Sequence, residues 1–201
     1  MRKAPQQARS REMVERIVNA GRGVLVDHGY DAFSTNRVAT AAGISPGSLY
    51  QYFPDKTAIL DVVIDRYWEE VAERVAASLS DRIADFGPGM VRATADALLS
   101  ALEADRELLR VVAEELPIHR SKERRAALER RVRELAATYL AVRADSTRRP
   151  DPATAAWVVV LAVENLAMRW VLDQPAAVSR AALLDEMVAL VGGYLLSPDA
   201  P

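Results

Sequence analysis

The sequence predicts an all-α protein of about nine helices, in which a small N-terminal helix-turn-helix domain precedes a larger helical domain. Apolar residues recur three to four positions apart along most of the 201-residue chain, which is the spacing of amphipathic helices. Two short helical patterns joined by a tight turn lie within residues 33–60. Proline and glycine separate the later helical patterns, most clearly at residues 86–89.

The turn between the two short helices has the residues that helix ends require. Ser34 or Thr35 can cap the first helix, because a side-chain oxygen there accepts a free backbone N–H. Gly43 follows that helix, where a residue tolerant of positive φ is needed. Ser45 can cap the second helix, and Pro46 suits its first position, where no N–H donor is required.

The second short helix separates buried from displayed residues. Leu49 and Phe53 lie four positions apart and should face the core. Its polar and aromatic side chains project elsewhere, namely Ser48, Tyr50, Gln51 and Tyr52. A short helix that presents its N-terminal half in this way suits insertion into a DNA major groove.

These residues resemble the TetR family of transcriptional regulators over about residues 10–62. The resemblance implies a ligand-responsive transcriptional repressor that binds palindromic operator DNA as a homodimer. It also implies a C-terminal domain that binds a small-molecule effector and forms the dimer. The matching motifs are residues 20–30, Ser34-Thr35, Val38-Ala39, Ala42-Gly43-Ile44, residues 49–53, Lys56 and Ile59-Leu60.

We expect two kinds of DNA contact from the motif. Gln51 can form a bidentate pair with adenine, and four more residues should approach base edges, namely Ser45, Gly47, Ser48 and Tyr52. By resemblance to the family, Thr35, Tyr50 and Lys56 should contact phosphates.

The net charge of −2 is unevenly divided along the chain. Residues 1–60 contain eight basic and five acidic side chains, a net charge of +3, which leaves −5 for the remainder. Positive charge therefore accompanies the helix-turn-helix, where binding to phosphates requires it.

The expected domains are residues 1–54, which bind DNA and include a flexible basic arm at residues 1–9, and residues 55–201, which bind the effector and form the dimer. A long helix near the boundary could carry motion between the two domains. Outside the motif, the expected helices cover residues 10–28, 55–84, 90–103, 105–116, 121–144, 151–173 and 179–196.

The last two helices carry apolar arcs wider than a surface helix needs. Such arcs predict packing on two sides, and we expect a homodimer built as a four-helix bundle. A larger internal core is the alternative. The candidate interface residues are Val163, Trp170, Leu183, Met187, Leu190 and Tyr194.

An effector pocket requires an apolar cavity with a few polar anchors. Glu164 is the most informative candidate, since its neighbours on the helical wheel are apolar and a buried carboxylate needs a partner or a raised pKa. It either binds a polar or cationic effector or pairs with an Arg across the dimer. The candidate lining residues are Trp68, Met90, Leu102, Tyr139, Trp157, Glu164 and Met168.

Composition argues against catalysis. The chain has no Cys, only two His, and no glycine-rich phosphate-binding motif, so we expect no metal, no cofactor and no enzyme activity. We also expect a cytoplasmic protein without a leader or membrane span. Two alternatives stay open. One is a TetR-like DNA-binding protein that lacks an effector or acts as an activator, and the other is a helical enzyme or adaptor.

Overall fold

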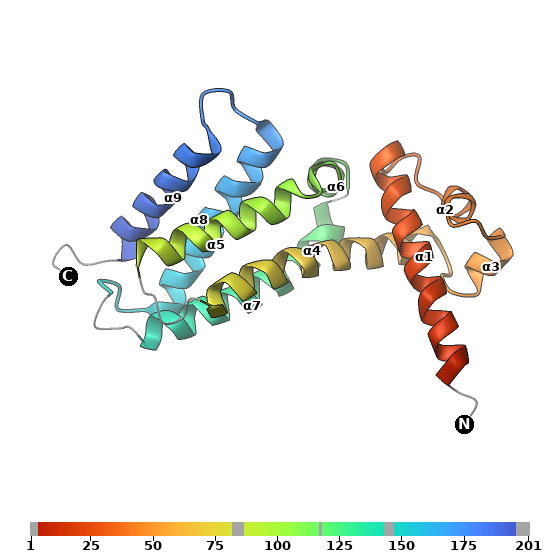
Figure 1. The fold of residues 1–201 in the computed structure, drawn as a ribbon, viewed down its shortest axis with the longest axis horizontal. Helices are drawn as coiled ribbons and strands as arrows, with labels where there is room; N and C mark the ends of the chain where they lie inside the picture. Colours follow the sequence, from red (N-terminus) through yellow and green to blue (C-terminus); the bar gives the residue numbers. More distant parts are fainter. Residues whose placement is uncertain (1–3, 82–86, 117, 143–146, 196–201) are drawn as a thin grey trace. The chain divides into compact units, whose positions relative to one another are not determined.

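The computed structural model describes residues 4–81, 87–116, 118–142 and 147–195 (Figure 1). Every regular element within these residues is a helix, which confirms the predicted all-α class. The chain divides into two compact units. The first comprises residues 1–67 and 107–123, and the second comprises residues 68–106 and 124–201.

The first unit begins with three helices, α1 (Ala4–His28), α2 (Thr35–Ala41) and α3 (Pro46–Tyr50). The expected basic arm at residues 1–9 is largely helix, because α1 begins at Ala4 rather than near Ser10. Residues 6–9 are Gln, Gln, Ala and Arg, all good helix formers, and Pro5 suits a first turn. Residues 1–3 lie outside the described part of the chain.

α1 ends where the sequence predicted. Gly29 adopts a φ of 72°, and its N–H donates to the Leu25 carbonyl at 3.0 Å. The Tyr30 N–H then donates to Glu115 Oε2 at 2.9 Å. Glu115 ends η1 (Val111–Glu115), a π-helical turn that follows α6 (Arg106–Arg110). The single helix expected over residues 105–116 is therefore two elements.

α4 (Lys56–Asp81) contributes to both compact units, which divide between Tyr67 and Trp68. The predicted domain boundary after residue 54 lies before this helix. Residues in the first half of α4 are instead core residues of the first unit, since Ile59, Leu60 and Ile64 are almost fully buried. Packing, rather than the helix start, sets the division between the units.

Gly21 allows α1 and α4 to pack closely. A Cβ atom at this position would lie 2.9 Å from Ile59 Cγ2 and 3.4 Å from Val63 Cγ2. Gly23, two residues on, faces open space, and nothing would lie within 4 Å of its Cβ. The two glycines of α1 thus have different roles, although the sequence alone treats them alike.

The second unit is a helical bundle. It contains α5 (Pro88–Glu103), α8 (Pro152–Asp173), α9 (Arg180–Leu195), the second half of α4 and most of α7 (Ile118–Val142). Asp151 caps α8 by accepting from the Ala153 N–H at 3.0 Å, and Gln174 ends it with a φ of 44°. These helices begin and end within three residues of the predicted bounds.

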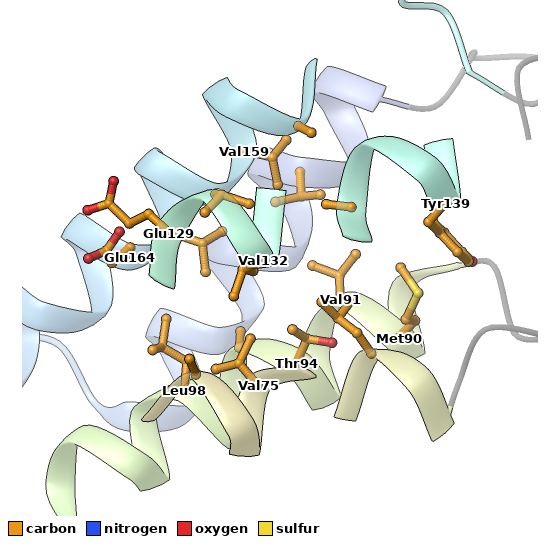
Figure 2. A pocket seen from close by; sticks show the side chains of 18 of the residues that line it. Val75, Met90, Val91, Thr94, Leu98, Glu129, Val132, Tyr139, Val159 and Glu164 are labelled. Atoms are coloured by element: carbon orange, nitrogen blue, oxygen red, sulfur yellow. The ribbon is translucent and has the colours of Figure 1, made fainter. Parts of the chain in front are cut away.

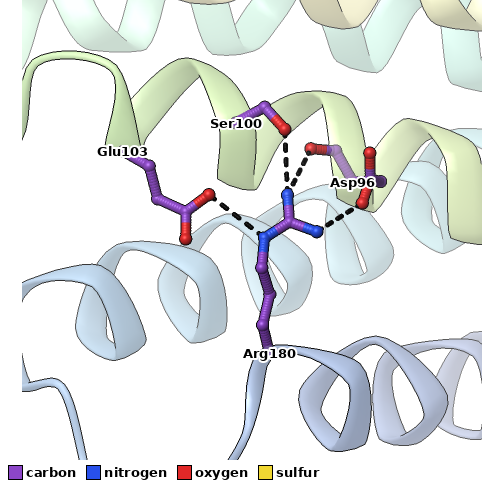
Figure 3. A network of polar contacts seen from close by, with 4 residues as sticks. All are labelled: Asp96, Ser100, Glu103 and Arg180. Carbon is purple, nitrogen blue, oxygen red and sulfur yellow. Dashed lines mark hydrogen bonds and ion pairs between the residues drawn. The ribbon is translucent and has the colours of Figure 1, made fainter.

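Arg180 connects α9 to α5 through hydrogen bonds and ion pairs (Figure 3). Its guanidinium donates to Asp96 Oδ1 at 2.5 Å, Ser100 Oγ at 2.9 Å and Glu103 Oε2 at 3.1 Å. The hydrogen bond with Asp96 is the largest cause that raises the pKa of Arg180 above its usual value. This arrangement fixes the start of α9 against the outer face of α5.

α8 is the most apolar helix of the described chain. Its best window has a mean hydropathy of 1.6, and only 28% of that window is buried within one copy of the chain. By length and composition alone α8 is apolar enough to cross a membrane, as the core helix of a soluble protein also is. Most residues of α8 are only partly buried in one copy of the chain, so the helix leaves apolar surface that a partner can cover.

Candidate DNA-binding surface and ligand cavity

The helix-turn-helix is built by the predicted caps. Ser34 Oγ accepts from the Arg37 N–H at 3.3 Å, and Ser45 Oγ accepts from the Ser48 N–H at 3.1 Å. Gly43 adopts a φ of 65° between the two helices. Because each bond joins residues three apart, the motif is specified locally by its own sequence.

One side of α3 is buried in the protein, and the other side is exposed. Leu49 is fully buried and Phe53 nearly so, whereas the Tyr50 side chain is 53% exposed. All eight predicted DNA-contact residues have accessible surface. Ser45, Gly47, Tyr50, Gln51 and Lys56 are exposed, and Thr35, Ser48 and Tyr52 are partly so. α3 therefore presents a polar surface of small and aromatic side chains.

Two of the predicted phosphate contacts lie together. The hydroxyls of Thr35 and Tyr50 are 3.1 Å apart and share a hydrogen bond between α2 and α3. Lys56 Nζ donates to the Phe33 carbonyl at 3.3 Å and lies 5.4 Å from the centre of the Tyr30 ring. Lys56 therefore ties the start of α4 to the end of the loop before α2, a structural role that sequence reasoning missed.

The second unit contains a cavity of about 160 Å³, lined from α4, α5, α7, α8 and α9 (Figure 2). Nearly all of its wall is carbon. Six of the seven predicted effector residues line it, namely Trp68, Met90, Leu102, Tyr139, Glu164 and Met168.

Trp157 was wrongly assigned to the cavity. Its side chain is 49% exposed and is absent from the cavity lining. A helix that is apolar on most of its circumference gives no sequence signal for which face lies inward.

Thr94 is a polar lining residue that the sequence analysis did not predict. It lies on α5 between Met90 and Leu98, so that the three residues form a row with a spacing of four. A polar residue that interrupts an apolar row was the available signal. Glu129, from α7, also lines the cavity, and Figure 2 draws its carboxylate and that of Glu164 at the same side of the pocket.

The predicted interface residues separate into three groups. Leu183 and Met187 are buried in the core of the second unit, Met187 with no exposed surface, which leaves neither side chain accessible to a partner in this structure. Val163 lines the cavity instead. Leu190 is 49% exposed, and Trp170 and Tyr194 are partly exposed, so these three can meet a partner.

Further apolar surface on α8 lies outside the predicted set. Leu166 is 40% exposed, and Trp157 adds a large aromatic side chain. Trp170 donates its indole N–H to the Val178 carbonyl at 2.8 Å, which fixes the ring beside the loop between α8 and α9.

The chain combines an exposed helix-turn-helix in one unit with an apolar cavity in the other, which is the arrangement of a DNA-binding regulator. The profile of the "Tetracyclin repressor-like, C-terminal domain" matches residues 88–195, and that of "Bacterial regulatory proteins, tetR family" matches residues 17–63. The chain belongs to the TetR family of transcriptional regulators. Members of this family are DNA-binding regulators and not enzymes, as predicted.

Individual relatives resemble the chain in different ways. A stretch of 52 residues is 36% identical to the nucleoid occlusion factor SlmA of Actinobacillus pleuropneumoniae. That stretch is 26% of either protein, so the match spans about a quarter of the length of such curated relatives.

Two solved structures share the fold over most of the chain. A TetR-family regulator from Mesorhizobium loti has a TM-score of 0.74 and 21% identity, covering 94% of this chain and 99% of that one. The multidrug binding protein EbrR, complexed with imidazole, has a TM-score of 0.66 and 21% identity, covering 92% and 96%.

Proposed function

We propose that the chain is a repressor that binds palindromic operator DNA as a homodimer and releases it when a small molecule binds. The observation that carries this proposal is the carbon-walled cavity of about 160 Å³ inside the domain that matches the tetracycline-repressor profile. A cavity of this size forfeits packing energy. A bound effector offsets that cost. The multidrug binding protein EbrR, of the same fold, was solved with a small molecule bound.

In this proposal α3 contacts the base edges, and residues of α2, α3 and α4 contact the phosphates. Base edges are approached by Gln51 and by four more residues, namely Ser45, Gly47, Ser48 and Tyr52. The exposed hydroxyls of Thr35 and Tyr50, already 3.1 Å apart, can converge on one phosphate oxygen. Lys56 adds a positive charge at the start of α4.

The homodimer forms through the uncovered apolar surface of α8 and α9. Leu166, Leu190 and Trp157 are each at least 40% exposed, although all three are large and apolar. Large apolar side chains exposed on two helices that pack together favour an interaction site. A closed two-fold dimer also matches the symmetry of a palindromic operator. Operator binding in this form places the protein in the cytoplasm.

α4 links effector and DNA. Lys56 begins this helix in the first unit, and Trp68, Val71 and Val75, further along, line the cavity in the second. An effector that fits one placement of α4 better than another shifts the population between DNA-binding and released forms. The two ligands must then weaken each other by one common factor.

Fluorescence anisotropy tests this with duplexes taken from the DNA upstream of the chain's own gene. We expect affinity that falls steeply with salt and a dimer per palindrome. An effector found by thermal-shift screening should lower operator affinity, and operator should lower effector affinity equally. Equal effector affinity with and without operator would contradict induction and leave a DNA-binding dimer.

Glu164→Gln serves as a matched variant, because it keeps the size of a side chain that lines the cavity. If Glu164 anchors the effector, the variant loses effector affinity and keeps operator affinity. Loss of dimerisation instead would show that Glu164 belongs to an interfacial ion pair.

A further inference from the structure

The size of the cavity restricts what can fill it. Pockets for drug-sized ligands measure roughly 300–1,000 Å³. An engineered apolar cavity of about 150 Å³ stays dry and binds benzene. The cavity of the second unit, at about 160 Å³, is close to the smaller case. The cavity therefore has room for about one aromatic ring.

Thr94 supplies a polar atom in the wall for which the described residues offer no hydrogen-bond partner. Thr94 Oγ1 is buried and forms no hydrogen bond with any described residue. An unsatisfied buried hydroxyl is unfavourable, and a ligand atom that pairs with it recovers the lost hydrogen bond. Its neighbours along the row on α5 are Met90 and Leu98, so this hydroxyl is an isolated polar point in an apolar stripe.

The carboxylates around the cavity oppose an anion, and its carbon wall opposes an ion of either sign. The described lining residues include two carboxylates, Glu129 and Glu164, and no Lys, Arg or His. An anion would have no counter-charge there and would lose its hydration. A cation would also lose hydration against the carbon wall beside Thr94, since Figure 2 draws both carboxylates at the opposite side from Met90 and Tyr139.

We propose that the effector is an uncharged one-ring compound with a single hydrogen-bonding group that pairs with Thr94 Oγ1. This inference rests on the proposed function for its biological meaning. It also goes further, because it names the ligand class and the residue that selects it. Burial of the ring provides the binding free energy, and the hydrogen bond with Thr94 distinguishes between ligands whose rings have the same size.

A matched series of four probes tests the class, with calorimetry on the full chain. The probes are toluene, benzyl alcohol, benzylammonium and benzoate, which share one ring and differ in polarity and charge. We expect both neutral probes to bind, and both ions to bind at least about tenfold more weakly than benzyl alcohol.

Thr94→Val tests the residue, because valine has the same shape without the hydroxyl. It should lower the affinity for benzyl alcohol about five- to tenfold and change that for toluene by less than about twofold. Thr138→Val is the control. Thr138 is exposed on α7, donates to the Glu134 carbonyl at 2.8 Å and does not line the cavity.

Three outcomes would overturn the inference. One is failure of both neutral probes to bind the unchanged chain. Another is tightest binding of benzylammonium with loss on Glu164→Gln, which would assign a cationic effector. The third is an equal effect of Thr94→Val on toluene and benzyl alcohol. Operator release is measured separately, so neutral probes that bind without releasing DNA would refute induction and leave the ligand class intact.

Discussion

Exchanging each of the two glycines of α1 for alanine should change the free energy of unfolding differently. Gly23→Ala should stabilise the first unit by about 1 kcal/mol, which is the helix-propensity difference at an exposed interior position. Nothing lies within 4 Å of the added Cβ. Gly21→Ala gains the same propensity but places its Cβ 2.9 Å from Ile59 Cγ2.

The cost at Gly21 follows from the atoms that it meets. Ile59 Cγ2 and Val63 Cγ2 are branch methyls, bound directly to Cβ, and cannot swing away as a chain end could. Overpacking of this kind costs about 1–3 kcal/mol. Subtracting the propensity gain leaves Gly21→Ala neutral to destabilising by about 2 kcal/mol, so the two variants should differ by about 1–3 kcal/mol.

Urea unfolding monitored by circular dichroism measures both variants against the unchanged chain. A double-mutant cycle with Ile59→Leu, which removes the Cγ2 branch, should recover part of the loss at Gly21 and leave Gly23→Ala unaffected. Equal stability of the two alanine variants would refute the close approach of α1 and α4.

Five further substitutions test DNA binding, stability and assembly separately. Tyr50→Ala and Lys56→Ala should each weaken binding about equally for all operator variants in a filter-binding assay, because contacts with phosphates do not depend on the base sequence. A changed preference for one base would show that the residue contacts bases instead. Only Lys56→Ala should also lower stability. Arg180→Met should cost about 1–2 kcal/mol in urea unfolding, because its hydrogen bonds are partly screened; an unchanged midpoint would refute the role of the network. Leu190→Glu should give folded monomers in sedimentation, whereas Met187→Glu should unfold the second unit.

The helix-turn-helix was predictable because its determinants are local. Ser45 caps a helix three residues away, and Gly43 supplies its own positive φ. Both depend on residue type and spacing, which the sequence states directly. The role of Lys56 was not predictable in the same way, because the Phe33 carbonyl is 23 residues distant in sequence.

The cavity was predictable only in part. The part of its lining that comes from α4 and α5 follows from apolar rows on these helices, where polar residues mark the outer face. α8 and α9 carry apolar residues on most sides, so the sequence could not decide that Met187 is internal and Trp157 external. The division of residues 105–116 into α6 and η1 had no signal either, because no Gly or Pro lies between Arg106 and Glu115.

The composition of α8 is explained by two protein surfaces better than by lipid. A membrane span would be apolar wherever it meets lipid, yet α8 carries an exposed Arg169–Asp173 ion pair at 3.0 Å near its end. Its inward residues, including Val163 and Glu164, line the cavity. Its outward residues, including Leu166, are uncovered in a single copy of the chain. With a partner subunit on the outer face, the effector and the partner would contact opposite sides of α8. A ligand that displaces α8 would then change the distance between the two subunits.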